Sequence, residues 1–332
     1  MQRPPANAAL VKRFNQKLDR IIGSDLPILQ KIKKFVIKSG GKRIRPITHF
    51  YFTAMLGYTG REWEDCGAIG ELIHAASLLH DDVVDEASMR RGKPSINALE
   101  GNKTAVLSGD YLLACGLDHL GTLPHAKGLL PVFTRVIRML AIGELLQMQH
   151  EHNLDLKARD YNRIILGKTG SLFGAMTESA WIVATEAEDG GNARMERRKA
   201  YRDFGERMGY LFQVRDDYLD YFGDAVRERK DIYQDFRRGL ITRPMIVLRD
   251  ALKGAAHRRL VKAWQNETLR NSAEGIELIR ELLHKNSIQK KLAQEIENEV
   301  HGLMHFLREH PESWARDRML VQLRGLLVPV EN

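Results

Sequence analysis

Apolar side chains recur every three or four residues along most of this chain, and this helical period constrains the fold more than any other feature. No Asn-Gly hairpin turn and no run of alternating β-branched residues interrupts it. The pattern therefore predicts an all-α fold. The clearest apolar stripes are Leu10, Phe14, Leu18, Ile21 and Ile22; Cys66, Ile69, Ile73, Ala76 and Leu79; Tyr201, Phe204, Met208, Leu211 and Phe212; and Leu292, Ile296, Val300, Met304 and Leu307.

The helical segments are separated by short breaks, and no low-complexity linker divides the 332 residues. The longest break is a charged loop from Gly223 to Gly239. Because 43% of the residues are hydrophobic, the chain can bury a large core. We therefore predict one domain that spans residues 1–332.

Charge and cysteine content narrow the class of protein. The net charge is +8, but no basic residues interleave with aromatics and no zinc-finger spacing occurs, so we expect no nucleic-acid partner. Cys66 and Cys115 are too few for a disulfide framework. No apolar run approaches the length of a transmembrane helix, and the first residues do not form a signal peptide. We expect a cytoplasmic protein.

Two clusters of aspartates share one internal spacing. The clusters are Asp81, Asp82 and Asp85, and far downstream Asp216, Asp217 and Asp220. Positions i and i+4 of a helix lie on one face, and like charges there repel. A cation between the carboxylates removes the repulsion, and carboxylate oxygens suit Mg²⁺, which usually also binds substrate phosphate. The alternative for a single cluster is a solvated helix end, but the recurrence of the pattern after a second apolar helix favours metal binding.

Basic residues lie close to both clusters in the sequence. Each alone could be a solvated surface group, but arginine binds phosphate in a bidentate manner and a helix N-terminus favours anions. Together they indicate a diphosphate that is held partly by metal and partly by direct cations. The residues are Arg90 and Arg91 after the first cluster, Lys230 after the second, and Lys42 and Arg45 at the start of a helix.

These motifs occur in the order found in the all-trans polyprenyl (isoprenyl) diphosphate synthases, which the chain resembles over roughly residues 40 to 245. The matching segments are GKRIRP at 41–46, ELIHAASLLHDDVVD at 71–85, MRRGKP at 89–94, Gly109-Asp110, Lys168-Thr169 and FQVRDDYLD at 212–220. The resemblance implies a single large helical bundle of the isoprenoid (terpenoid) synthase type with a central product tunnel. It is greatest to long-chain, octaprenyl-like members.

The resemblance also implies a reaction. An allylic diphosphate is held with three Mg²⁺ ions between the two clusters, ionises, and is attacked by isopentenyl diphosphate, and the proton is then lost to the released diphosphate. Repetition gives an all-trans polyprenyl diphosphate. A homodimer is expected from the family, and a long prenyl product would partition into lipid, which is compatible with peripheral membrane contact.

By the same resemblance, individual residues receive expected roles. Asp81, Asp85 and Asp216 are expected to bind metal directly, and Asp82, Asp217 and Asp220 to act directly, through water, or by supporting the ligands. The expected contacts to the allylic diphosphate are Arg90, Lys168 and Lys230; those to isopentenyl diphosphate are Lys42, Arg45, His74 and Arg91; and Thr169 and Gln213 are expected to line the reacting centre.

The chain departs from the family pattern after the second cluster. The family has Gly-Lys, Gly-x-Asp and Gly-Lys-x-Thr there, whereas this chain has Arg229-Lys230, Tyr233-Gln234-Asp235 and Gly239-Leu240-Ile241-Thr242. The lysine expected at Leu240 is missing. We expect the loss of one cation toward the allylic diphosphate, with either a weaker allylic site or a different closure of the loop. All six aspartates remain, so we still expect activity.

Product length is expected to depend on residues one turn before the first cluster. Ala76 and Ser77 lie there, where short-chain members of the family carry bulky aromatics. Small side chains indicate an open tunnel and a hexaprenyl-to-decaprenyl product, with Ile73 and either Met148 or Gln147 as candidates for its floor. The alternative is that Ala76 and Ser77 only allow close helix packing.

Other functions compete with this interpretation. A short-chain farnesyl or geranylgeranyl diphosphate synthase differs only in product length. A terpene cyclase has a second metal motif that mixes Asn, Ser or Thr with Glu, unlike residues 216–220. A weakly active subunit of a heteromeric synthase typically loses aspartates, and only the altered loop around Leu240 favours it.

Overall fold

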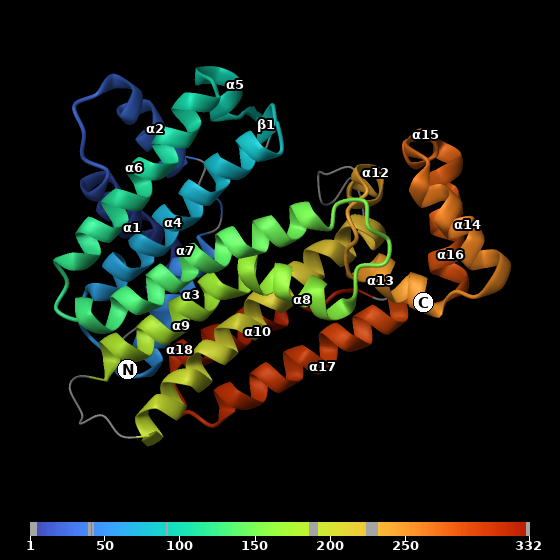
Figure 1. Cartoon of the computed structure of the whole chain (residues 1–332). Helices are drawn as coiled ribbons and strands as arrows, with labels where there is room; N and C mark the ends of the chain where they lie inside the picture. Colours follow the sequence, from blue (N-terminus) through green and yellow to red (C-terminus); the bar gives the residue numbers. More distant parts are fainter. Residues whose placement is uncertain are drawn as a thin grey trace. The chain divides into compact units, whose positions relative to one another are not determined.

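The structure is a computed structural model, and it describes residues 5–38, 41, 43–90, 92–185, 192–223 and 232–329 (Figure 1). Nearly all of these residues are helical or lie in short connections, so the all-α prediction is confirmed. The elements in chain order are α1 Asn7–Ile21, α2 Pro27–Lys38, α3 Ile44–Met55, α4 Glu62–Val84, β1 Met89–Arg90, β2 Lys93–Pro94, α5 Ile96–Glu100, α6 Asn102–Gly121, α7 Ala126–Gln149, α8 Ala158–Ile165, a π-helical turn η1 Leu166–Gly170, α9 Ser171–Ala184, α10 Asn192–Phe222, α12 Gln234–Arg238, α13 Arg243–Ala251, α14 Gly254–Gln265, α15 Glu267–Arg270, α16 Ala273–Lys285, α17 Ile288–Arg308 and α18 Trp314–Arg324.

The chain divides into two compact units, each described by itself. Unit 1 comprises Met1–Arg138, Leu172–Gly205 and His310–Met319, and unit 2 comprises Met139–Ser171, Glu206–Glu309 and Leu320–Asn332. The sequence-based expectation of one domain over residues 1–332 stays a prediction. Among the described residues, no helix combines the length and the apolarity that crossing a membrane requires.

The apolar stripes of the sequence form the cores of these units. In unit 1, α4 packs on α6, α3 and α1. A buried cluster there joins residues of α1 and α2 to Leu72, Ala76 and Leu79 of α4. In unit 2, the stripe of α17 from Leu292 to Leu307 is buried. Burial of each large aliphatic side chain contributes roughly 1.5–3 kcal/mol relative to exposure, so these stripes supply most of the drive to fold.

A small antiparallel hairpin follows the first aspartate cluster, and no sequence pattern predicted it. Met89 pairs with Pro94 and Arg90 with Lys93. Gly92, at φ 75°, supplies the left-handed backbone that the turn requires. The hairpin directs Arg90 back toward the end of α4, which fixes one side of the candidate site.

His49 of α3 is the least satisfied polar side chain of the unit 1 core. It is fully buried, and neither Nδ1 nor Nε2 has a hydrogen-bond partner among the residues that the structure describes. Burial lowers the pKa of His49 to about 3, because a buried imidazolium loses its hydration. The folded protein therefore holds this ring neutral over the whole range in which an unfolded chain protonates it.

This burial makes stability depend on pH. Below pH 6.5, His49 binds a proton in the unfolded chain but stays neutral in the folded chain. As the pH drops toward 3, this difference lowers the free energy of unfolding by about 1.4 kcal/mol per pH unit. We expect His49→Leu to flatten the fall between pH 7.5 and 5.5 in urea titrations. The exposed His301→Leu serves as the control, and equal slopes in all three proteins would contradict the assignment.

Candidate active site

The first aspartate cluster lies at the C-terminal end of α4, in unit 1, and its three carboxylates have different surroundings. Asp82 is 1% exposed and forms an ion pair with Arg90 of the hairpin. Arg90 Nε lies 2.8 Å from Asp82 Oδ1 and 3.0 Å from Oδ2, and Arg90 Nη2 lies 2.7 Å from Oδ1. Asp81 is half-buried and Asp85 is exposed. Asp81 and Asp85 lie one turn apart on one face of the chain, which leaves Asp82 as the carboxylate that anchors the hairpin.

The residues before this cluster divide between two faces of α4. Ser77 and His74 lie four and seven residues before Asp81, on the same face, and the Ser77 hydroxyl donates to the His74 carbonyl at 2.9 Å. Both are half-buried. Ala76 instead belongs to the buried cluster with Leu72 and Leu79. The helical period therefore places Ser77 with the carboxylates and Ala76 against the core.

The arginines at the start of α3 have separate environments. Arg43 is buried in an ion pair with Glu71 at 2.5 Å and donates to the carbonyls of Val36 and Ile37, so it holds α2, α3 and α4 together. The guanidinium carbon of Arg45 lies 5.1 Å from the centre of the Phe173 ring. Lys42, Arg91 and Lys230, which the sequence placed at the substrate phosphates, lie outside the described residues.

The second cluster lies at the C-terminal end of α10, in unit 2, and a network of donors surrounds its middle carboxylate. Asp217 is 3% exposed. Its Oδ2 accepts from the hydroxyl of Tyr161 at 2.5 Å and from the backbone N–H of Arg243 at 3.3 Å, and its Oδ1 accepts from Gln213 Nε2 at 3.0 Å. Burial raises the pKa of Asp217 to about 6, and the three hydrogen bonds oppose that rise.

Gln213 extends this network to Thr169, whose hydroxyl donates to Gln213 Oε1 at 3.1 Å. The structure therefore joins Thr169, Gln213 and Asp217, which the sequence had assigned to the site separately. Tyr161 and Arg243 were missed. The sequence carried no signal for either, because the seven-residue spacing from Tyr161 to Lys168 crosses the π-helical turn Leu166–Gly170 and does not keep one helical face.

Asp220 has a different task in unit 2. Its carboxylate accepts the backbone N–H groups of Gln234 at 3.1 Å and Asp235 at 3.0 Å, at the start of the short helix α12. The backbone N–H of Tyr233 donates to the Asp220 carbonyl at 2.6 Å. A carboxylate suits this position, because the first N–H groups of a helix lack partners within it. Asp220 thus anchors the segment that follows residues 224–231. Asp216 is the outward member of the cluster, with its side chain 40% exposed.

The departures from the family pattern occur in this same segment. Tyr233 has the left-handed φ of 62° that glycine adopts without cost. Its ring is buried, packs edge-on against Tyr221 with 5.5 Å between ring centres, and lies 5.8 Å from the guanidinium of Arg280. Burial of the ring offsets the strain of the backbone. Leu240 is half-buried, and its N–H donates to the Asp235 carbonyl at 2.8 Å.

Lys168 lies in the π-helical turn η1, where one extra residue per turn redirects the side chains. A Cβ on Gly167 would meet the Cα of Gly143 at 2.8 Å, so α7 and η1 cross in backbone contact. This crossing brings the ammonium of Lys168 into an ion pair with Glu144 and within 3.1 Å of Gln147 Oε1. Gln147, one of two alternative candidates for the tunnel floor, is thus also a partner of Lys168, and Glu144 was missed.

The carboxylate oxygens of the two aspartate clusters are suitable ligands for Mg²⁺. Among the described residues, no three His, Cys, Asp or Glu side chains gather into a complete metal cage. Mg²⁺ does not need one, because it usually binds one or two carboxylates together with waters and substrate phosphates. The exposed Asp85 and the partly exposed Asp81 and Asp216 suit such shared binding. The two clusters belong to different units, so their convergence on one ion stays a prediction.

Known sequences and structures resemble this chain along most of its length. The family model described as polyprenyl synthetase matches residues 26–282. The chain is 34% identical over 240 residues to octaprenyl diphosphate synthase of Escherichia coli, covering 72% of this chain and 69% of that protein. It is 38% identical over 242 residues to an all-trans-nonaprenyl-diphosphate synthase (geranyl-diphosphate specific) of Rhodobacter capsulatus, covering 73% and 72%. The crystal structure of a decaprenyl diphosphate synthase from Rhodobacter capsulatus superposes with a TM-score of 0.84 at 29% identity, covering 96% and 95%.

The Tyr161 hydroxyl should contribute measurably to stability, because its loss leaves a buried carboxylate oxygen with one long hydrogen bond. We expect Tyr161→Phe to lower the free energy of unfolding by about 1–3 kcal/mol. Tyr210→Phe is the matched control, since Tyr210 is partly buried in the same unit and the structure shows no hydrogen bond to its hydroxyl. Denaturant titrations in which the two variants lose the same stability would contradict the network.

Proposed function

We propose, since the chain belongs to the polyprenyl synthetase family and is a trans-prenyltransferase, that it condenses an allylic diphosphate with isopentenyl diphosphate, head to tail and repeatedly, to give a long-chain all-trans polyprenyl diphosphate. The observation that supports the proposal is the difference in surroundings among the six carboxylates at the C-terminal ends of α4 and α10. Asp82 and Asp217 are buried and bind Arg90 and Tyr161, and Asp220 accepts two backbone N–H groups. Asp81, Asp85 and Asp216 are more exposed than Asp82 and Asp217.

The exposed members would hold the metal, three Mg²⁺ ions in each site. Bound Mg²⁺ supplies the positive charge that stabilises a departing diphosphate. The chain's own residues position and neutralise the rest of the diphosphate. Lys168 would contact it through an ammonium that Glu144 and Gln147 hold in place, and Arg90 would contact it from a guanidinium that Asp82 orients.

The network from Thr169 to Tyr161 would shape the reacting centre. Thr169 and Gln213 present a hydroxyl and an amide beside Asp217, so the carbon–oxygen bond would ionise next to fixed dipoles rather than bulk water. The allylic carbon is then attacked by the double bond of isopentenyl diphosphate, and the released diphosphate takes the proton. No protein nucleophile is required.

The direct test is incubation of the purified protein with farnesyl diphosphate, labelled isopentenyl diphosphate and Mg²⁺, followed by chain-length analysis. A linear ladder ending between hexaprenyl and decaprenyl supports the proposal. Products no longer than geranylgeranyl would assign a short-chain synthase, and a cyclised hydrocarbon a terpene cyclase. Failure to turn over without a second chain would indicate a subunit of a heteromeric synthase. Parallel reactions with geranyl diphosphate would identify the preferred primer.

We further propose a homodimer that operates in the cytoplasm. The supporting observation for a dimer is a row of exposed apolar side chains along α7, at Leu130, Ile142 and Leu145, which a second copy would cover. Cys66 and Cys115 are both free, as expected in a reducing compartment. Sedimentation velocity of Leu145→Glu beside the unmodified protein tests the dimer, and an unchanged sedimentation coefficient would exclude this face.

Because Asp82 is buried and Asp81 is partly exposed, substitutions of these neighbours should affect different properties of the protein. We expect Asp81→Asn to lower kcat about 100- to 1000-fold at constant stability, because it removes a metal ligand from the exposed end of the cluster. Asp82→Asn should lower the free energy of unfolding by about 3 kcal/mol, because it leaves Arg90 without its buried partner. Kinetic and thermal measurements should include the exposed Asp118→Asn as a control. Full activity of Asp81→Asn would contradict the metal assignment.

Product length should respond to Ser77 rather than to Ala76. We expect Ser77→Phe to shorten the product, because residue 77 shares the helix face of Asp81 and Asp85. Ala76→Phe should instead overpack the core and lower the free energy of unfolding by about 1–3 kcal/mol. Chain-length analysis and denaturant titration of both variants check this. Shortening by Ala76→Phe alone, at normal stability, would place the product on the other face of α4.

A further inference from the structure

The helices α1 and α2 at the start of unit 1 carry most of the excess positive charge of the chain. Residues 7–38 contain eight Lys or Arg and two Asp, whereas the net charge of all 332 residues is +8. Four of these cations are committed to ion pairs, Arg13 with Glu64, Lys17 with Asp65, Lys31 with Glu100 and Lys33 with Asp19. The remaining four are exposed and have no acidic partner in the described chain: Lys12, Arg20, Lys34 and Lys38.

The exposed lysines of α2 form one stripe. Lys31, Lys34 and Lys38 recur at the spacing of a single helix face, opposite the buried Ile32 and Val36. α2 contains no acidic residue, so these ammonium groups repel one another with no counter-charge on their own helix. An external anionic surface would relieve that repulsion. Leu26, 55% exposed, immediately precedes the helix and adds an apolar contact at its start.

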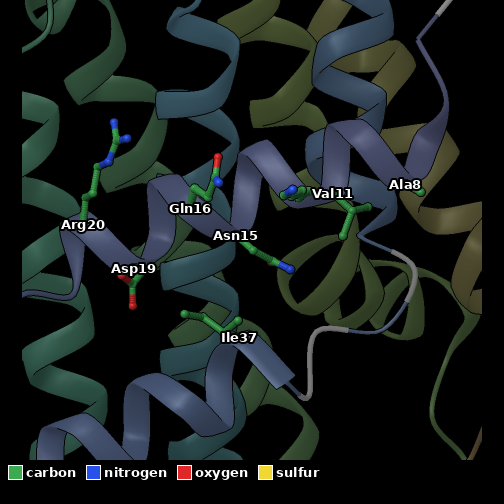
Figure 2. Close-up of a pocket in the computed structure, with 8 residues that line it drawn as sticks. Ala8, Val11, Asn15, Gln16, Asp19, Arg20 and Ile37 are labelled. Carbon is green, nitrogen blue, oxygen red and sulfur yellow. The ribbon is translucent and has the colours of Figure 1, made fainter.

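A groove of about 740 Å³ lies beside this stripe, between α1 and the end of α2 (Figure 2). Apolar atoms of Ala8, Val11 and Ile37 contribute to its lining, and Figure 2 shows Ile37 opposite Asn15 and Asp19. Lys12 and Arg20 lie along the α1 side. The one acidic residue of the lining, Asp19, is neutralised by Lys33 at 2.9 Å. The groove therefore combines apolar surface with two uncompensated cations.

We propose that the α1–α2 surface, defined by Lys12, Arg20, Lys34, Lys38 and Leu26, docks on an anionic lipid bilayer. Clustered cations beside apolar side chains match a layer of lipid phosphates over acyl chains, and each Lys or Arg near such a surface adds attraction that salt screens. Docking goes beyond the proposed reaction and does not depend on it. For an enzyme with a long prenyl product, it would place the protein where that product dissolves.

The test is flotation of the 332-residue protein with vesicles of phosphatidylcholine, with or without 30% phosphatidylglycerol, at about 0.1 M salt. We expect binding only to the anionic vesicles, and weaker binding as salt rises. Neutralising the four unpaired cations together (Lys12→Gln, Arg20→Gln, Lys34→Gln, Lys38→Gln) should lower the partition coefficient on the order of a hundredfold. Leu26→Ser should lower it further at high salt, where the apolar contact dominates.

A matched control changes the same net charge elsewhere. Lys253→Gln, Arg258→Gln, Lys262→Gln and Lys290→Gln remove four exposed cations of unit 2, and this variant should bind vesicles almost as the unmodified protein does. Equal losses in the two variants, binding to neutral vesicles alone, or no binding at low salt would overturn the proposal. Tighter binding to a random single-stranded RNA at equal salt would assign the surface to nucleic acid instead. The vesicles contain no substrate, so loss of prenyltransferase activity and loss of docking are measured independently.

Discussion

Burying carboxylates at the C-terminal end of a helix is the constraint on which both aspartate clusters depend. The helix dipole disfavours anions there, and burial and mutual repulsion disfavour them further. In each cluster, hydrogen-bond donors from the protein offset this cost for the buried carboxylate. Arg90 neutralises Asp82, while Tyr161, Gln213 and the Arg243 N–H satisfy Asp217. These contacts fix the buried carboxylates, while Asp81, Asp85 and Asp216 lie at less buried positions of the same helix ends.

The same donors position the other polar groups of unit 2. Asp217 orients Gln213, and Gln213 orients Thr169, so one buried carboxylate fixes the direction of a hydroxyl on a different element.

The π-helical turn sets the directions of the Lys168 and Thr169 side chains. A regular α-helix through residues 166–170 would turn Lys168 and Thr169 by a different amount, and only a Gly143–Gly167 crossing lets α7 approach closely enough for Glu144 to pair with Lys168.

The apolar period and the aspartate spacing were sufficient to predict the helices, the buried stripes and the helix ends that carry the clusters. They were insufficient for contacts between distant residues. Nothing near Asp82 indicates that Arg90 returns through a hairpin, and nothing near Asp217 indicates a tyrosine 56 residues earlier. Ala76 and Ser77 are adjacent in sequence and both small, yet 100° of helix rotation separates a core position from one on the carboxylate face.

The segment after the second cluster explains how the chain tolerates its departures from the family pattern. Where the pattern has a flexible glycine, Tyr233 accepts a left-handed backbone that costs roughly 1 kcal/mol, and it recovers more than this by burying its ring against Tyr221. Asp220 then holds the adjacent N–H groups. A segment anchored by a carboxylate and a buried aromatic depends less on a lysine at position 240 for its conformation. Leu240, where the family pattern has a lysine, therefore leaves in place the contacts that order the chain around the second cluster.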